Sequence, residues 1–406
     1  MAVNLSAPES LSPVAGVRLG SAEAAIKKPG RQDLLVIELA AGSRVAGVFT
    51  QNAFAAAPVQ LCRERLAASS AIRALLINAG NANAATGLGG LADARETTAA
   101  VATALGCDAA AVLPFSTGVI GQRLPIARMT AAVPAAIKNL TADAWGNAAR
   151  AIMTTDTVPK GASRRVQTAQ GEVTITGIAK GVGMIEPHMA TMLAFVATDA
   201  CLAPAAVDRA LRDAVNQSFN CVTVDSDTST NDSCVLCATA QVGSKDINVG
   251  DADYAVIATA LNEVCIELAQ AVVRDGEGAT RFITVNVSGA GDVSEARQVG
   301  YAVANSPLVK TAMFAGDANW GRIVMAIGKA GVAGLNPATV GIRLDDVTLL
   351  EGGEPHPDYR EERGAAVVAR PEFTIHVTLG RGEASARLWT CDFSYDYVKI
   401  NAEYRT

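Results

Sequence analysis

The Ala190–Thr191 pair has the residue types of a self-cleaving N-terminal nucleophile. It lies in residues 180–200, KGVGMIEPHMATMLAFVATDA, where a small residue precedes a β-hydroxy residue and an apolar, strand-like run follows. Breaking the bond between them would give Thr191 a free α-amino group, which titrates near pH ~8 and can serve as base for its own hydroxyl. This chemistry needs no histidine, and the chain has only three. The alternative is an ordinary threonine at the start of a strand.

Three other segments carry groups that an acyl transfer could use. Thr117 and Gly118 offer a hydroxyl and a closely approaching backbone for the oxyanion of a tetrahedral intermediate, where one fixed donor is worth about 3–4 kcal/mol. Lys180 could meet a substrate carboxylate or lower the pKa of a nearby amine. Glu277, in DGEGAT, could pair with the ammonium group of an amino-acid substrate. The alternatives are an ordinary turn after a strand at 111–115, a solvated surface lysine and a turn carboxylate.

Asn401 and Thr406 lie in the last six residues of the chain, where disorder is usual. The preceding run at 388–400, LWTCDFSYDYVKI, is rich in aromatic and β-branched residues. We therefore expect the C-terminus to dock onto the fold if these two residues line a site.

Strand-like and helix-like segments mix along the whole chain. Runs rich in β-branched residues and bounded by Gly, Asp or Pro predict strands, whereas Ala-rich runs with apolar residues on one face predict helices. The predicted strands are 34–39, 45–49, 74–77, 173–178, 192–198, 235–242, 282–287, 373–379 and 386–391, and the predicted helices are 91–105, 126–138, 204–217 and 254–273. Without a strict β-α-β rhythm, this mixture predicts a layered α/β or α+β architecture with packed sheets.

Composition argues against several classes of protein. The 406 residues are half hydrophobic and carry a net charge of −6, which argues against nucleic acid as the main partner. We find no charge-free apolar stretch long enough to span a membrane, and we expect no secretory signal. The eight cysteines are expected to be buried thiols. Cys234 and Cys237 form a C-x-x-C in a strand-like run without further ligands, so we expect no metal there.

Residues 225–232, DSDTSTND, look like a cation-binding loop at first sight. An EF-hand would need Gly and Glu where this chain has Thr230 and Leu236, so we reject calcium. A loop rich in hydroxyls and carboxylates beside the catalytic strands fits the residues better. The asparagines at 78–83 are expected to order the site through amide hydrogen bonds, with no chemical role assigned.

Taken together, these blocks resemble the ArgJ family, the glutamate N-acetyltransferases also called ornithine acetyltransferases. The family-like blocks are NAGNANAATG (78–87), STGVIG (116–121), TTDT (154–157), DSDTSTND (225–232), DGEGAT (275–280), DANWGRI (317–323) and NAEYRT (401–406), with the segment around Thr191. They occur in family order over nearly the full length. The resemblance implies an α-β-β-α layered sandwich of the DmpA and ArgJ type, in the N-terminal-nucleophile class.

The resemblance also implies roles for particular residues. Cleavage between Ala190 and Thr191 would give an α-chain of residues 1–190 and a β-chain of residues 191–406 in one interlocked folded unit. Thr117 and Gly118 match the oxyanion-hole pair of the family. The substrate-binding positions map onto Thr154, Lys180, Thr191, Glu277, Asn401 and Thr406. Thr155 stays an alternative to Thr154.

The implied activity is a self-processing acetyl transfer in arginine biosynthesis. The acetyl group would move from N2-acetyl-L-ornithine to L-glutamate through acetyl-Thr191, giving L-ornithine and N-acetyl-L-glutamate by ping-pong kinetics. No metal or resident cofactor is implied, and use of acetyl-CoA stays open. The resemblance suggests small-molecule substrates, a cytoplasmic location, and two α- and two β-chains. The alternatives are an N-terminal-nucleophile aminopeptidase or amidase, which passes the acyl group to water, and a non-catalytic binding protein of the same fold.

Overall fold

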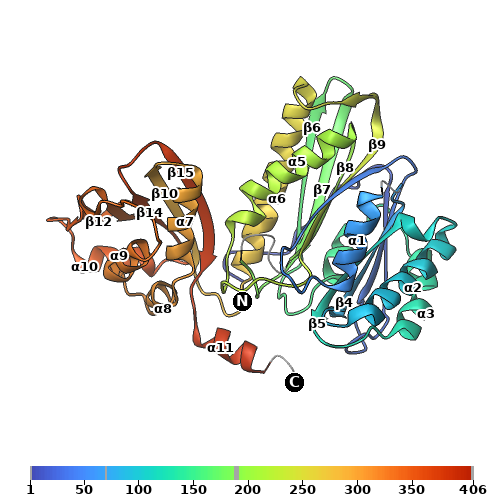
Figure 1. The fold of residues 1–406 in the computed structure, drawn as a ribbon, viewed down its shortest axis with the longest axis horizontal. Helices are drawn as coiled ribbons and strands as arrows, with labels where there is room; N and C mark the ends of the chain where they lie inside the picture. Colours follow the sequence, from blue (N-terminus) through green and yellow to red (C-terminus); the bar gives the residue numbers. More distant parts are fainter. Residues whose placement is uncertain (1, 69–70, 187–191, 404–406) are drawn as a thin grey trace. The chain divides into compact units, whose positions relative to one another are not determined.

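The computed structural model describes residues 2–68, 71–186 and 192–403. The chain divides into two compact units (Figure 1). We call residues 7–220 and 227–272 the N-terminal unit, and residues 1–6, 221–226 and 273–406 the C-terminal unit. The N-terminal unit has two sheets and the C-terminal unit has one, and each unit has its own core.

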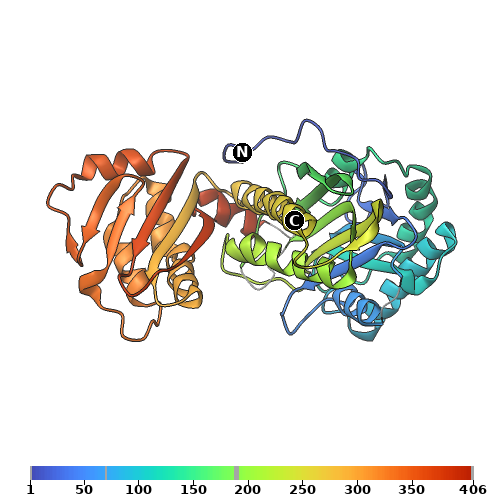
Figure 2. The ribbon, with the colours of Figure 1, turned by 90° about the horizontal axis from the view of Figure 1, so that it is seen from above.

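The N-terminal unit contains two sheets, which can be followed in Figures 1 and 2. The four-stranded sheet has the order β1-β2-β4-β5, and the five-stranded sheet has the order β3-β9-β8-β7-β6. The pairs β4–β5 and β8–β9 are parallel, and the other pairs are antiparallel. The strands are β1 (Val17–Ala22), β2 (Leu34–Leu39), β3 (Arg44–Phe49), β4 (Ala74–Asn81), β5 (Val112–Val119), β6 (Lys160–Thr168), β7 (Gly171–Lys180), β8 (Leu193–Leu202) and β9 (Ser233–Ile247).

The two sheets pack face to face, and strands such as β2 and β8 are apolar on both sides. Leu35 of β2 belongs to a core shared with the five-stranded sheet, whereas its neighbour Leu34 belongs to the core under α2 and α3. Successive side chains of a strand alternate between its faces, so one continuous apolar run fills both cores. Phe115 of β5 and Phe195 of β8 meet edge to face between the sheets, with ring centroids 5.0 Å apart.

Helices cover both outer faces of this pair of sheets. Helices α2 (Gly87–Leu105) and α3 (Ile126–Lys138) cover the four-stranded sheet, and α5 (Pro204–Gln217) and α6 (Ala252–Arg274) cover the five-stranded sheet. Two shorter helices, α1 (Ala57–Ala67) and α4 (Trp145–Ala151), pack against β5 and β1 respectively. The mixed α/β class and the α-β-β-α sandwich that the resemblance implies are confirmed in this unit.

The sequence predicted no stretch that could span a membrane, but helix α6 is long and apolar enough to do so. By length and composition it is the one helix of the described residues that could do so, with a mean hydropathy of 1.6. Its Glu263 and Glu267 pair with Arg164 of β6. Its Leu268 side chain is so close to the β7 backbone that a Cβ at Gly177 would lie 3.0 Å from it. These contacts account for the apolar character of α6 as packing on the sheet.

The C-terminal unit is built on one six-stranded sheet with the order β13-β12-β11-β14-β10-β15. Its strands are β10 (Phe282–Ala290), β11 (Gly341–Leu344), β12 (Val347–Glu351), β13 (Glu354–Pro355), β14 (Glu372–Thr378) and β15 (Ala384–Cys391). Its helices are α7 (Val293–Ala304), α8 (Pro307–Ala315), α9 (Trp320–Gly328), α10 (Glu361–Val368) and α11 (Tyr395–Ala402). Phe373, Ile375 and Val377 of β14 alternate inward and share one core with α7 to α10.

Candidate active site

Thr117 and Gly118 lie within strand β5, not in a turn after it. The Thr117 side chain is buried. Gly118 has a φ of +132°, and a Cβ at this position would lie 2.2 Å from the carbonyl carbon of Gly80 in the neighbouring strand β4. Only glycine permits this backbone conformation together with such a close approach. The sequence alternative of an ordinary turn is therefore wrong.

Lys180 is the last residue of β7, and its side chain is buried. Its Nζ donates a hydrogen bond to Oγ1 of Thr117 at 3.3 Å. Because Lys180 occupies a lone pair of this oxygen, the Thr117 hydroxyl proton is available to another acceptor. The alternative of a solvated surface lysine is wrong, and two of the predicted site residues are in direct contact.

Asp156 supplies the negative charge beside Lys180 and was not singled out in the sequence. Its Oδ2 lies 4.0 Å from Lys180 Nζ, and its Oδ1 accepts from Lys160 Nζ at 2.7 Å. Burial by itself would raise the pKa of the Asp156 carboxyl. The charges on Lys160 and Lys180, with hydrogen bonds from Lys160 and the Gly181 N–H, outweigh burial and hold that pKa well below its usual range.

Thr154 joins this cluster through its backbone. Its N–H donates to Asp156 Oδ2 at 3.0 Å, in the loop between α4 and β6. Thr154 and Thr155 are both half-buried, so exposure does not separate them. Lys160 and Asp156, in contrast, have side chains with no exposed surface.

The loop at 225–232 reaches the same strands. Asn231 is buried, and its Nδ2 donates to the carbonyl oxygens of Ala82 at 2.6 Å and Ser116 at 2.9 Å. Asp232 next to it is also buried and accepts from the Met192 N–H at 3.0 Å. This confirms the expectation of a polar loop beside these strands, although the sequence gave neither residue a role of its own.

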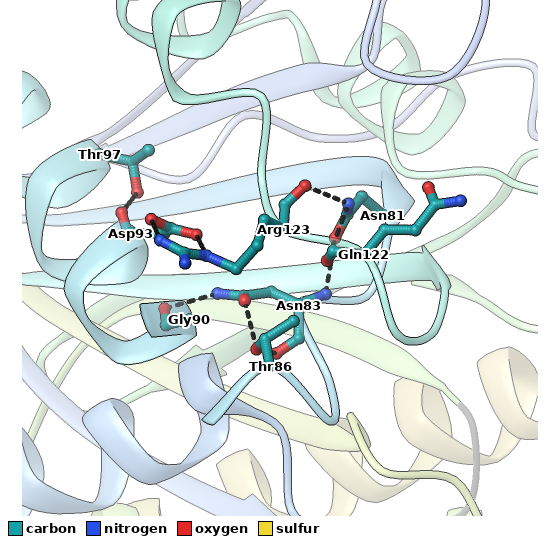
Figure 3. A network of polar contacts seen from close by, with 8 residues as sticks. All are labelled: Asn81, Asn83, Thr86, Gly90, Asp93, Thr97, Gln122 and Arg123. Atoms are coloured by element: carbon teal, nitrogen blue, oxygen red, sulfur yellow. Dashed lines mark hydrogen bonds and ion pairs between the residues drawn. The ribbon is translucent and has the colours of Figure 1, made fainter. Parts of the chain in front are cut away.

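The asparagine block orders the ends of β4 and β5 through amide hydrogen bonds, as expected. Ser116 Oγ donates to Asn78 Oδ1 at 2.6 Å. Farther along, Asn81 Nδ2 donates to the Arg123 carbonyl and Asn81 Oδ1 accepts the Asn83 N–H, while the Arg123 side chain pairs with Asp93 of α2 (Figure 3). The network fixes the segment that follows Gly80, against which Gly118 packs.

A second pair of predicted residues meets in the C-terminal unit. Asn401 of α11 donates through Nδ2 to Oε2 of Glu277 at 2.9 Å. Helix α11 docks onto the same turn through Ser394, its capping residue, whose Oγ donates to the Gly278 carbonyl at 2.6 Å. A Cβ at Gly278 would lie 2.4 Å from the Tyr397 nitrogen, so the turn and the helix fit closely. The expected docking of the chain end is confirmed as far as the described residues extend.

The predicted residues thus fall into three groups. Thr117, Gly118, Thr154 and Lys180 come together in the N-terminal unit, and Glu277 and Asn401 in the C-terminal unit. Ala190, Thr191 and Thr406 lie outside the described residues. Sequence reasoning gave no individual role to four residues of these networks, Asp156, Lys160, Asn231 and Asp232. Three of them lie in the blocks TTDT and DSDTSTND, whose residues were not distinguished from one another. Lys160 lies outside every block, and no sequence pattern pointed to it.

The C-x-x-C cysteines lie in a buried strand, as expected. Cys234 and Cys237 belong to β9, and both are buried. Burial raises the pKa of Cys237 to about 12, so its thiol stays protonated at neutral pH. Within residues 2–68, 71–186 and 192–403, no group of three or more His, Cys, Asp or Glu side chains is arranged to hold a metal ion.

Comparison with known proteins finds full-length relatives. The model of the ArgJ family matches residues 18–406. The chain is 56% identical to the arginine biosynthesis bifunctional protein ArgJ of Methylococcus capsulatus, over 98% of this chain and 97% of that protein. It is 51% identical to the protein of the same name from Pseudomonas fluorescens, over 100% of both chains. The solved structure of ornithine acetyltransferase with ornithine from Mycobacterium tuberculosis is 38% identical and has a TM-score of 0.40, covering 43% of this chain and 93% of that chain.

Proposed function

The chain belongs to the ArgJ family, and on that premise we propose that it is an acetyltransferase of arginine biosynthesis. It moves the acetyl group of N2-acetyl-L-ornithine to L-glutamate. The observation that carries this proposal is the match of 51–56% identity along essentially the whole length of proteins named for arginine biosynthesis. Those relatives favour the transferase over an aminopeptidase or amidase.

The first chemical event is cleavage of the Ala190–Thr191 bond, which frees the Thr191 amine. Strand β8 begins at Leu193 and is the middle strand of its sheet. It pairs with β7, which precedes the cleavage point, with Leu193 opposite Lys180. This pairing supports an α-chain of residues 1–190 and a β-chain of residues 191–406 that stay in one folded unit after cleavage.

In the transfer itself, the Thr191 amine takes the proton of the Thr191 hydroxyl. The hydroxyl oxygen attacks the acetyl carbonyl, and the oxyanion is held by the Thr117 hydroxyl and the Gly118 N–H. The hydrogen bond from Lys180 to Thr117 supports this role, because it leaves the hydroxyl proton free and strengthens it as a donor. Ornithine leaves with a proton, and glutamate then takes the acetyl group from Thr191.

Recognition of the amino-acid substrates is assigned to charged and polar groups among the predicted residues. The Lys180 ammonium suits a carboxylate, and the Glu277 carboxylate suits an ammonium group. Thr154, Asn401 and Thr406 complete the proposed set. The acetyl group travels on Thr191, so the reaction needs no resident cofactor or metal. Acetyl-CoA as a second acetyl donor would account for the word bifunctional in the relatives' name.

We also propose a cytoplasmic enzyme that assembles from two α- and two β-chains. This proposal comes from the family resemblance. Native mass spectrometry of the purified enzyme would test it directly, because a four-chain complex and a single αβ pair differ twofold in mass.

The experiment is denaturing mass spectrometry with N-terminal sequencing, followed by a transfer assay. Wild-type protein should give a fragment beginning Thr-Met-Leu-Ala, and Thr191→Ala should stay intact and lose transfer altogether. Thr198→Ala, a matched change in strand β8, should still be cleaved. Acetyl transfer by the Thr191→Ala variant would overturn the mechanism. Release of acetate at the same rate with and without glutamate would instead point to the amidase.

A further inference from the structure

The two oxygens of the buried Asp232 carboxyl group differ in their contacts with the described residues. The residue immediately precedes β9, and its side chain is only 1% exposed. Its Oδ1 accepts from the Met192 N–H at 3.0 Å. Its Oδ2 has no hydrogen-bond partner among the described residues. A buried polar atom without a hydrogen-bond partner lowers the stability of the folded protein. Such an atom therefore needs an explanation, for example a ligand or a chemical role.

Asp232 is fixed where several strands of the five-stranded sheet meet. Its carbonyl oxygen accepts from the Thr50 N–H at 3.0 Å, just beyond β3. Met192 is held on both sides, since its N–H donates to Asp232 and its carbonyl accepts from the Ser233 N–H at 3.1 Å. Met192 is joined covalently to Thr191. The Asp232 carboxyl is therefore held at the peptide group that follows the proposed nucleophile.

The surroundings of Asp232 make the ionisation of its carboxyl sensitive to a cation placed beside it. Burial raises the pKa of its carboxyl well above the usual range, against the hydrogen bond from the Met192 N–H and the opposing influence of nearby Ser229 and the Lys180 charge. Lys180, on β7, is the charged group that acts on Asp232, and it is itself compensated by Asp156 at 4.0 Å. A cation arriving beside Oδ2 would favour the carboxylate and be stabilised by it.

We propose that Asp232 is a positioning residue for Thr191, a proposal that rests on the function proposed above. Oδ1 fixes the backbone at Met192, and Oδ2 accepts a hydrogen bond from the α-amino group that self-cleavage frees. When this amine takes the proton of the Thr191 hydroxyl it becomes an ammonium, and the Asp232 carboxylate stabilises that charge. Asp232 thus orients the base, as a third group does in other activated nucleophiles.

Asp232→Asn is the direct test, because asparagine keeps an oxygen for Met192 but can neither carry the charge nor accept through its NH2 group. We expect kcat for transfer to fall about 10- to 100-fold, as for a misplaced reacting group. KM for N2-acetyl-L-ornithine should change less than about twofold, because ground-state binding is untouched. Losing the carboxylate lowers the pKa of the amine, so the acidic limb of the kcat profile should move to lower pH by about one unit.

Asp199→Asn is the matched control. Asp199 is also a buried aspartate whose pKa is raised by burial, and it accepts from the Thr174 N–H at 2.8 Å. This variant should be cleaved and should keep the wild-type kcat and acidic limb. A purely structural role for Asp232 would change stability without moving that limb.

The remaining outcomes also decide the matter. Wild-type kcat and an unmoved acidic limb in cleaved Asp232→Asn would overturn the proposal. A folded Asp232→Asn chain that stays uncleaved, while Asp199→Asn is cleaved, would overturn the proposal as stated, because Asp232 would then act on self-cleavage, before the amine exists. Should Asp232→Asn not fold, Asp232→Ser is measured by the same criteria, since its smaller side chain cannot over-pack. Failure of the wild-type enzyme to form acetyl-Thr191 would overturn the proposed function itself, whereas an active wild type with an unaffected Asp232 variant removes only the role of Asp232.

Discussion

The loop that enters β6 and the loop that enters β9 each bury one aspartate near Lys180, but they treat its charge in opposite ways. In the first loop, Asp156 accepts from Lys160 at 2.7 Å and from the Gly181 N–H at 2.8 Å, and its pKa lies well below the usual range. In the second, one oxygen of Asp232 accepts no hydrogen bond from the described residues, and burial raises the pKa of Asp232 well above that range. Both side chains are buried, so the partners decide which form is stable.

This difference in pairing indicates different roles for Asp156 and Asp232. Asp156 is a permanent anion that compensates Lys160 and Lys180, and it fixes the lysine that contacts Thr117. Asp232 has spare hydrogen-bonding capacity and an ionisation state that a neighbouring cation can change. The ion pairs of Asp156 hold the lysines in place. The carboxyl of Asp232 can still accept a hydrogen bond from a cation that forms during the proposed reaction.

The largest expected effect on stability comes from breaking the ion pair between Asp156 and Lys160. Lys160→Met removes the closest cation from a fully buried carboxylate, and breaking such a pair costs about 3–5 kcal/mol. Lys180 still lies 4.0 Å from Asp156, so we expect a loss near 3 kcal/mol in the free energy of unfolding measured with urea. Arg164→Met on the same strand is the control, since its pairs with Glu263 and Glu267 are exposed and worth about 0–1 kcal/mol. Equal losses in the two variants would contradict the assignment of Asp156 as a buried, paired anion.

A smaller effect is expected from the neighbour of Asp232. Asn231→Ala removes the donor of two buried hydrogen bonds and leaves the carbonyls of Ala82 and Ser116 without it. We expect urea unfolding to show a loss of about 2 kcal/mol, the usual cost of unsatisfied buried groups. Asn248→Ala, at an exposed position, should change stability by less than about 0.5 kcal/mol. An unchanged stability of Asn231→Ala would mean that the 225–232 loop does not brace strand β5.

The finest test is the pH dependence of stability in Asp156→Asn and Asp232→Asn. The depressed pKa of Asp156 contributes stability that is present above the unfolded value of ~3.9 and is lost as pH falls through the folded value. The raised pKa of Asp232 works the other way, because its contribution is present below ~3.9 and is lost as pH rises toward the folded value.

The two variants should therefore differ from wild type in different pH ranges. As pH rises from ~4 toward ~8, Asp232→Asn should become more stable relative to wild type, by about 1.4 kcal/mol for each pKa unit, whereas Asp156→Asn should keep a constant difference. As pH falls below ~4, Asp156→Asn should approach the wild-type stability. Asp199→Asn should follow Asp232→Asn in sign, because burial also raises the pKa of Asp199. Parallel pH dependences for Asp156→Asn and Asp232→Asn would remove the electrostatic contrast between the two loops.

Much of the N-terminal unit could be predicted from local pattern. Strand β2 and helices α3 and α5 have the predicted bounds, because LLVIEL is apolar on both faces and the helices have a clear apolar stripe. Strand β9 was predicted at its apolar part, 235–242, but extends to Ile247, where its residues are mostly exposed. The C-terminal unit was predicted less completely. Helices α7 to α10 are short, and their existence depends on the sheet they cover.

Within the site, the sequence by itself determined residue types and blocks. Thr117, Gly118, Lys180, Glu277 and Asn401 could be named because a hydroxyl, a glycine, charges and an amide carry recognisable chemistry in blocks shared with a known family. Only the tertiary structure decided which of these groups meet, and that Lys180 is buried against Thr117. Asp156 and Asp232 are the same residue type in similar polar loops, and nothing local distinguishes them. Their opposite ionisation arises from strands and loops that are distant in sequence, because desolvation and pairing depend on the surroundings that folding creates.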